Sequence, residues 1–130
     1  MTVEYSGKDI GMVAAEDLSA RQFCYVHQAT DNTVDLLDST SELPFGILQN
    51  APEDGETAVV RIEGTSKLVM NAAVAVATYV KAEYVGAADN GKGDAADTDR
   101  DVVSGQVIKA SGAEDDVGAV IITRFTLSSA

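Results

Sequence analysis

The sequence predicts an all-β fold, a small antiparallel sandwich or barrel built from two approximate repeats and carrying long acidic loops. Three observations lead to this prediction. Short segments rich in β-branched residues alternate in polarity and are separated by Gly, Asn, Asp and Ser. Two stretches about 56 to 60 residues apart follow the same apolar order. The length, 130 residues, suits a single domain.

The repeat is clearest in two glycine-led segments. One is GILQNAPEDGETAVVRI from Gly46, and the other is GQVIKASGAEDDVGAVIIT from Gly105. Each has aliphatic residues, a short acidic turn and an alternating strand, and a similar apolar lead-in precedes each. A unit of this size cannot hold a core of its own, so the two copies must share one. We expect a single β domain over residues 10–127, with repeats at 10–64 and 66–124.

The individual strands are predicted from alternation. In TAVVRIE, the residues Ala58, Val60 and Ile62 would face one side of a sheet, while polar residues such as Arg61 would face the other. The same reasoning applies to the other segments, whose residues also favour extended backbone. The predicted strands are 22–28, 34–37, 45–48, 57–63, 79–85, 102–108 and 119–127.

Three segments do not read as strands. NAAVAVAT from Asn71 lacks the apolar stripe of a helix, and we expect irregular structure or one turn there. The segment 86–101 has no apolar residue larger than alanine, which predicts an exposed, mobile loop. Residues 1–9 are polar around Val3 and Tyr5, and they predict a flexible N-terminal arm that becomes ordered against a partner.

Charge restricts the class of partner. Twenty-one acidic and nine basic residues give a net charge of −12. This charge opposes binding to nucleic acid or to an anionic membrane, because both depend on Lys and Arg. The chain has neither a transmembrane run nor a signal peptide, so we expect a soluble protein made in the cytoplasm. The single cysteine, Cys24, predicts a small apolar residue on a strand and no internal disulfide.

Patterns that resemble catalytic or ligand sites are incomplete. GAADNGKG from Gly86 lacks the Ser or Thr of a phosphate-binding loop. Asp97, Asp99 and Asp101 have the initial spacing of a calcium loop, but the later ligands are missing, which leaves only weak divalent binding open. His27 is the sole histidine. We therefore predict no enzyme activity, no catalytic or metal site and no cofactor.

The order of these motifs resembles the capsid cement, or head decoration, proteins of tailed bacteriophages, from about Ile10 to Thr126. That family shows a glycine with an aliphatic pair, an Ala-rich turn, then Gly-Glu and an alternating strand, approximately repeated. The second copy departs from the pattern, with Asp115-Asp116 in place of Gly-Glu. The matching residues of the first copy are Gly46-Ile47-Leu48, Ala51-Pro52, Gly55-Glu56, Val59 to Ile62, and Gly64.

The resemblance implies a β-barrel or β-tulip-like fold without catalysis. It also implies a virion protein that binds the major capsid protein on the outer surface of the assembled head in many copies and stabilises it. A homotrimer would match the lattice symmetry. We expect Val3 and Tyr5 of the arm to contact the capsid. The alternatives are a displayed adhesive or carbohydrate-binding module, a minor tail or baseplate protein, and a small hydrolase using an acidic pair.

Overall fold

The computed structural model describes residues 5–39, 42–84, 88–97 and 101–126, which form strands and no helix. The all-β prediction is confirmed. The strands make one mixed sheet in the order β1-β3-β2-β4-β5-β9-β8-β6-β7. They are β1 (Gly7–Ala14), β2 (Tyr25–Thr30), β3 (Thr33–Leu36), β4 (Gly46–Leu48), β5 (Thr57–Val69), β6 (Tyr79–Ala82), β7 (Gly93–Ala95), β8 (Val102–Lys109) and β9 (Val117–Thr126).

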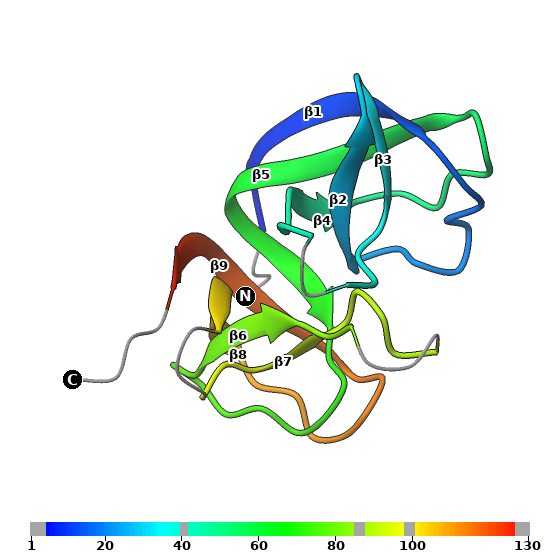
Figure 1. Cartoon of the computed structure of the whole chain (residues 1–130). Coiled ribbons are helices and arrows are strands. Elements are labelled where there is room, and N and C mark those ends of the chain that lie inside the picture. The colour runs from blue at the N-terminus through cyan, green and yellow to red at the C-terminus, as the bar shows by residue number, and fades with distance from the viewer. Residues whose placement is uncertain (1–4, 40–41, 85–87, 98–100, 127–130) are drawn as a thin grey trace.

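The sheet closes on itself in each half of the chain. In the first half, the order β1-β3-β2-β4-β5 is closed because β1 also pairs with the first part of β5. In the second half, the later part of β5 pairs with β9, and a parallel bridge from Met70 to Gly93 joins the far strand β7 back to the end of β5. Figure 1 shows the halves as two lobes, with β5 running through both.

One strand pair departs from the predicted antiparallel arrangement. β1 and β3 run parallel, with Val13 beside Thr33 and Ala14 beside Val34. The segment between β1 and β2 brings β3, and not β2, next to β1, so the two strands share a direction. The parallel bridge between Met70 and Gly93 repeats this feature in the second half.

β5 changes its partner at Gly64. The strand pairs with β1 up to Gly64 and with β9 from Thr65 onward. Gly64 has a φ of +95°, and a Cβ atom there would lie 2.4 Å from the carbonyl oxygen of Ser6. A side chain would violate both constraints, so glycine is required where the strand passes from one half to the other.

The two halves repeat the same backbone hydrogen bonds. The amide of Ala14 donates to Glu56, as that of Met70 donates to Asp116. Three further bonds of the first half, written from amide donor to carbonyl acceptor, have counterparts in the second half. Phe23 to Leu48 corresponds to Ala77 to Val107, Leu48 to Cys24 corresponds to Val107 to Thr78, and Leu18 to Pro52 corresponds to Val74 to Ser111. Positive φ angles also recur at corresponding positions, namely Phe23 and Ala77, Asn32 and Gly91, and Gly55 and Asp115.

Two apolar clusters form the core, and the second draws on both halves. The buried residues of the first cluster all come from the first half, including Met12, Leu18, Val26 and Val60, and Val69 of the second half packs against them. In the second cluster, the buried residues of the second half are joined by three from the first. Those three are Tyr25, Leu37 and Ile47. The side of the first half that carries these three residues is therefore covered by the second half. This contact makes the two lobes one packed unit.

Two segments predicted to lack regular structure contain strands. β1 begins at Gly7, inside the range 1–9 expected to be an arm. Within the expected loop 86–101, β7 pairs with β6, and Lys92 and Gly93 are buried. Backbone pairing decides both cases, because main-chain hydrogen bonds do not need apolar side chains. The described residues of NAAVAVAT are irregular, as predicted.

Candidate interaction surface

Of the two residues expected to contact a capsid, the structure describes only Tyr5. Val3 lies outside the described residues. Tyr5 is half-buried, and its carbonyl oxygen accepts a hydrogen bond of 3.1 Å from Nη1 of Arg61. Tyr5 lines a surface groove of about 300 Å³ together with Phe23, Lys67 and Val117. The described end of the arm is thus held against the domain.

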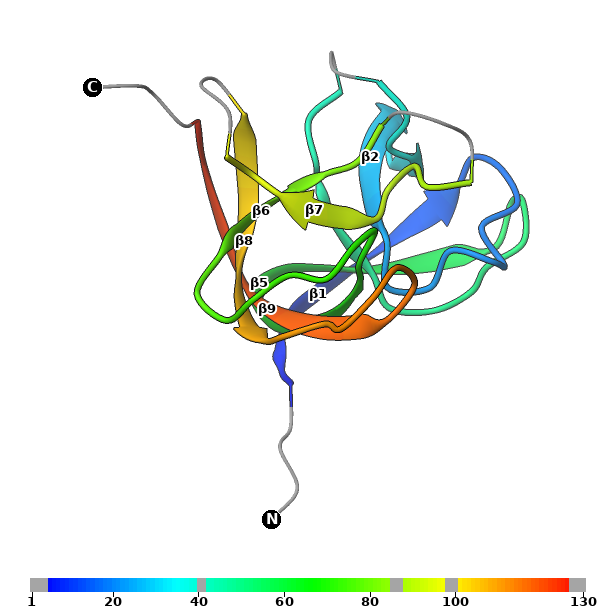
Figure 2. The same ribbon diagram turned by 90° about the horizontal axis from the view of Figure 1, so that it is seen from below.

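An apolar surface lies on β6, β8 and β9, and we call it the outer face. Five large apolar side chains there are between 39% and 44% exposed. The rings of Tyr79 and Phe125 meet edge to face, with centroids 4.9 Å apart. Figure 2 shows β8 and β9 side by side along one edge of the second half. The members of the outer face are Tyr79, Ile108, Val117, Ile121 and Phe125.

Strand register places three of these side chains, Tyr79, Ile121 and Val117, on one face of the sheet. Tyr79 pairs with Gln106, and Gln106 pairs with Ile121 across the next strand. Side chains of directly paired residues lie on the same face of a sheet. Val117 is an even number of residues from Ile121 on β9, so it lies on that face and joins the outer face to the groove beside Tyr5.

The outer face corresponds to a surface that is covered in the first half. There, Tyr25 pairs with Ile47, and Ile47 pairs with Arg61. The matching row in the second half is Tyr79, Gln106 and Ile121. Tyr25 and Ile47 are fully buried against the second half, whereas Tyr79 and Ile121 are exposed. The same side of the same framework is thus an internal interface in one half and open in the other.

Charge also distinguishes the outer face. Within the described strands β6, β8 and β9, the sequence has no Asp or Glu and has Lys81, Lys109 and Arg124. By contrast, residues 5–64 carry eleven acidic and three basic side chains. Close approach of another protein is least opposed by repulsion where carboxylates are absent. Exposed apolar residues grouped in this way are typical of an interaction site.

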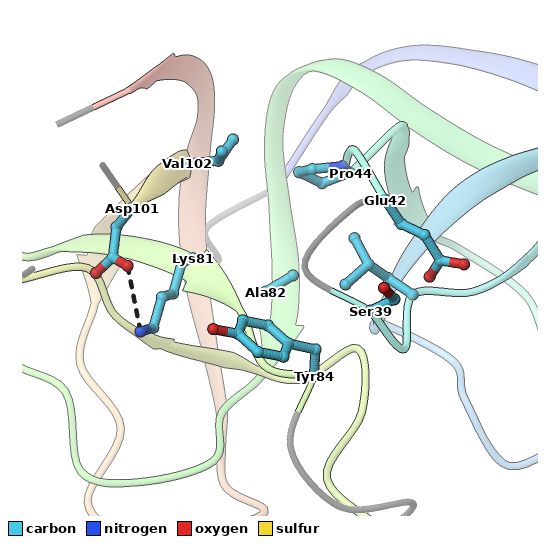
Figure 3. A pocket seen from close by; sticks show the side chains of 9 residues that line it. Ser39, Glu42, Pro44, Lys81, Ala82, Tyr84, Asp101 and Val102 are labelled. Atoms are coloured by element: carbon cyan, nitrogen blue, oxygen red, sulfur yellow. Dashed lines mark hydrogen bonds and ion pairs between the residues drawn. The ribbon is translucent and has the colours of Figure 1, made fainter. Parts of the chain in front are cut away.

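A small cleft lies at the junction of the two halves. It has a volume of about 210 Å³ and is lined by Glu42, Pro44, Lys81, Tyr84 and Asp101, among others. Figure 3 shows the Lys81–Asp101 ion pair on one side of the cleft, with Nζ and Oδ1 3.5 Å apart. The carboxylate of Glu42 points away from this pair. Among the described residues that line the cleft, Tyr84 is the only aromatic one, and it offers little surface for stacking on a sugar.

The incomplete motifs occupy structural positions. Lys92, the lysine of the GAADNGKG segment, is buried and paired with Asp89 and Asp115 at 2.9 and 2.5 Å. The ammonium of Lys92 thus binds two carboxylates of the protein, where a phosphate-binding lysine would bind a phosphate. Asp101 belongs to the ion pair with Lys81, Asp97 is exposed, and Asp99 lies outside the described residues.

Cys24 is a buried core residue immediately before β2. Burial raises the pKa of its thiol to about 11. The thiolate, which is the nucleophilic form, is therefore scarce at neutral pH. This environment is that of a structural cysteine and not of a catalytic one.

The outer face was not among the sites predicted from the sequence. Strict alternation predicts polar residues on the exposed side of a half-buried strand, but β9 reads VGAVIITRFT, with apolar side chains on both faces. That departure from alternation, together with the absence of acids from β8 and β9, is the signal that could have identified it.

The comparisons with known proteins show a similarity of fold. No family model matches the chain, and no curated protein matches it. Among solved structures, the fold is similar to that of the head fiber gp8.5 N base of bacteriophage phi29, with a TM-score of 0.64 and 13% sequence identity. The match covers 94% of this chain and 98% of the phage chain. At this identity the comparison shows a shared fold. Among the described residues there is also no helix able to span a membrane.

Proposed function

We propose that this chain is a structural protein of a tailed-phage head, bound in many copies to the outer surface of the capsid. The observation that carries the proposal is the fold shared with the phi29 head fiber base over nearly the whole of both chains. The motif order that resembles head decoration proteins supports it independently. Within this class, we assign the chain the role of a cement, which stabilises the assembled head by binding it.

We assign the outer face to self-association. Copies that each carry a charge of −12 repel one another, so a stable contact between them needs a surface without carboxylates. The outer face meets this condition, and the corresponding surface of the first half already packs against protein. Three copies with their outer faces around a threefold axis would form the expected homotrimer.

We assign capsid contact to the arm, through Val3 and Tyr5. The groove beside Tyr5 adjoins the outer face at Val117, so three arms would lie close to one trimer interface. One contact of millimolar affinity contributes only about −4 kcal/mol, whereas three engaged together could approach about −12 kcal/mol. We assign the major capsid protein as the partner of the three arms.

The deciding experiment mixes purified protein with undecorated heads and images them by cryo-electron microscopy. Regular density on the outer surface, together with a higher temperature of head rupture, is the expected result. Heads that stay bare while tails or baseplates acquire density would overturn the placement. Glycan-array binding of micromolar affinity would favour the adhesive alternative.

Two variants separate the two contacts. Deleting residues 2–4 together with Tyr5→Ala removes the arm without cutting into β1, and it should abolish head binding while the trimer persists. Ile121→Asp should yield monomers in light scattering, because it buries a carboxylate at the trimer axis. Val76→Asp, at another exposed apolar residue, is the control and should change neither property. A trimeric Ile121→Asp protein that fails to bind heads would show that the outer face contacts the capsid instead.

A further inference from the structure

A group of metal-ligating atoms lies on the first half, apart from the outer face. His27 is on β2, Asp35 is on β3, and Glu42 follows in the connection to β4. One ligand atom from each residue lies within 4.8 Å of the other two. His27 Nε2 is 3.0 Å from Glu42 Oε2 and also contacts Asp35 Oδ1. All three residues are partly buried.

The backbone fixes this arrangement. His27 and Asp35 are direct partners in the antiparallel pair β2–β3, so their side chains lie next to each other on one face. The second oxygen of Glu42 accepts a 2.8 Å hydrogen bond from the amide of Asp38. This bond orients the carboxylate so that Oε2 faces the imidazole. Metal ligands in proteins are commonly held by such secondary hydrogen bonds.

The hydrogen-bonding capacity of the group is not satisfied by its own members. Nε2 of His27 can carry one proton, yet it faces two carboxylate oxygens. Oδ1 of Asp35 is buried and makes no hydrogen bond of acceptable geometry. Glu16 and Asp38 add further negative charge nearby. A cation among the three atoms would accept a lone pair from each, which a single shared proton cannot do.

The second half contains a corresponding group with a different centre. Lys81 and Asp94 are direct partners in β6–β7, as His27 and Asp35 are in β2–β3. Asp101 pairs with Lys81, as Glu42 pairs with His27. In the second half, the ammonium of Lys81 supplies a fixed positive charge between two acids. In the first half, an imidazole takes this position, and a neutral imidazole binds transition metals.

We propose that His27, Asp35 and Glu42 bind one Zn²⁺ ion, which holds the β3–β4 connection against β2. One imidazole nitrogen and two carboxylate oxygens form a ligand set that Zn²⁺ accepts, with water in the remaining position. The ligand set does not suit Ca²⁺ or Mg²⁺, which prefer oxygen alone. The ion replaces the charge that Lys81 provides in the second half. This assignment is independent of the proposed function.

The test uses untagged, full-length protein treated with chelator and then titrated with Zn²⁺ by calorimetry. One ion per chain should bind with micromolar affinity, and Mg²⁺ should not compete at a hundredfold excess. His27 is the sole histidine, so its ring signals in NMR report the site directly and should shift on saturation. Co²⁺ should give the absorption bands of a coordinated ion. Absence of saturable binding, or binding without a change at His27, would refute the proposal.

His27→Lys is the sharpest variant, because it copies the design of the second half. It should abolish Zn²⁺ binding and leave the metal-free protein as stable as the wild type or more so, since the ammonium can pair with both acids. Glu42→Gln should weaken binding at least tenfold. Asp101→Asn, at the corresponding acid of the second half, is the matched control and should bind Zn²⁺ normally. Binding that survives His27→Lys, or that disappears in Asp101→Asn, would place the ion elsewhere.

Discussion

The two halves share a backbone framework but differ in what covers it. In the first half, Tyr25 and Ile47 lie in the core between the lobes, whereas Tyr79 occupies the position of Tyr25 and is open to solvent. The same strand register and turn geometry therefore occur whether this face of the sheet is buried or exposed. A repeated unit can use one copy of a surface for internal packing and keep the other for a partner.

The two halves also differ in charge, and the first half is the more acidic. Residues 5–64 hold eleven acidic and three basic side chains, while residues 65–126 hold nine and six. The paired strands β8 and β9 of the second half have no acidic residue. At the position where the second half has Lys81, the first half has His27. The acidic half would thus suit solvent and cations, and the second half would suit contact with protein.

The largest change in unfolding free energy is expected when matching residues of the covered face and the open face are each replaced by alanine. Tyr25→Ala should cost about 4 kcal/mol of unfolding free energy, because it empties a fully buried aromatic site. Tyr79→Ala, at the matching open position, should cost about 1 kcal/mol in the monomer. Urea denaturation of both variants, measured on an Ile121→Asp background to exclude association, checks this. Equal costs would mean that the two faces are not in different environments.

The next effect concerns the strand that joins the halves. Gly64→Ala should cost about 3 kcal/mol, because a φ of +95° is strained for alanine and its Cβ would clash with the Ser6 carbonyl. Gly55→Ala is the control, since its φ of +86° is similar but no atom lies within 4 Å of the added Cβ. It should cost about 1 kcal/mol. If the two variants unfold at the same urea concentration, the contact at the junction contributes nothing.

A smaller effect is expected at an ion cluster of the second half. Lys92 is buried between Asp89 and Asp115, while the corresponding Thr33 of the first half bonds to Thr30. Lys92→Met should cost about 1 to 2 kcal/mol, a modest value because Asp115 is exposed and solvent screens the pair. Lys67→Met, at an exposed lysine over the ring of Phe23, should cost less than 1 kcal/mol. Thermal unfolding of both variants checks the difference.

The cluster of Lys92, Asp89 and Asp115 predicts that the stability of the protein depends on pH. The hydrogen bond from Lys92 lowers the pKa of Asp89 below its usual 3.8. Burial lowers the pKa of Lys92, but the bonds to Asp115 and Asp89 outweigh it and raise that pKa above 10.5. The ion cluster therefore stabilises the fold fully between the usual pKa values of the two groups, 3.8 for Asp89 and 10.5 for Lys92. It is lost as the pH falls through the pKa of Asp89 or rises through that of Lys92. Stability of Lys92→Met should approach that of the wild type at both extremes.

Alternation and turn residues were sufficient to predict the fold class and most strands. In β5, Ala58, Val60 and Ile62 do face inward, because burial of one face imposes a period of two. β1 and β7 were missed, since GKDIG and GDA carry little apolar signal and are fixed by backbone pairing with distant strands. The outer face and the group around His27 depend on which strands become neighbours, and a single sequence does not give that.

The smallest effect tests whether the halves unfold separately. Cys24 is the only cysteine and belongs to the core of the first half. Burial raises its thiol pKa to about 11, so a thiol reagent at pH 8 should react only when this core opens. Because β5 runs through both lobes and Tyr25 packs into the second core, opening should require global unfolding. The labelling rate should therefore rise as the free energy of unfolding falls across the Tyr79→Ala, Gly55→Ala and Lys92→Met variants. Labelling that is fast and unaffected by Lys92→Met would show that the first half opens without the second, and that the shared strand does not couple them.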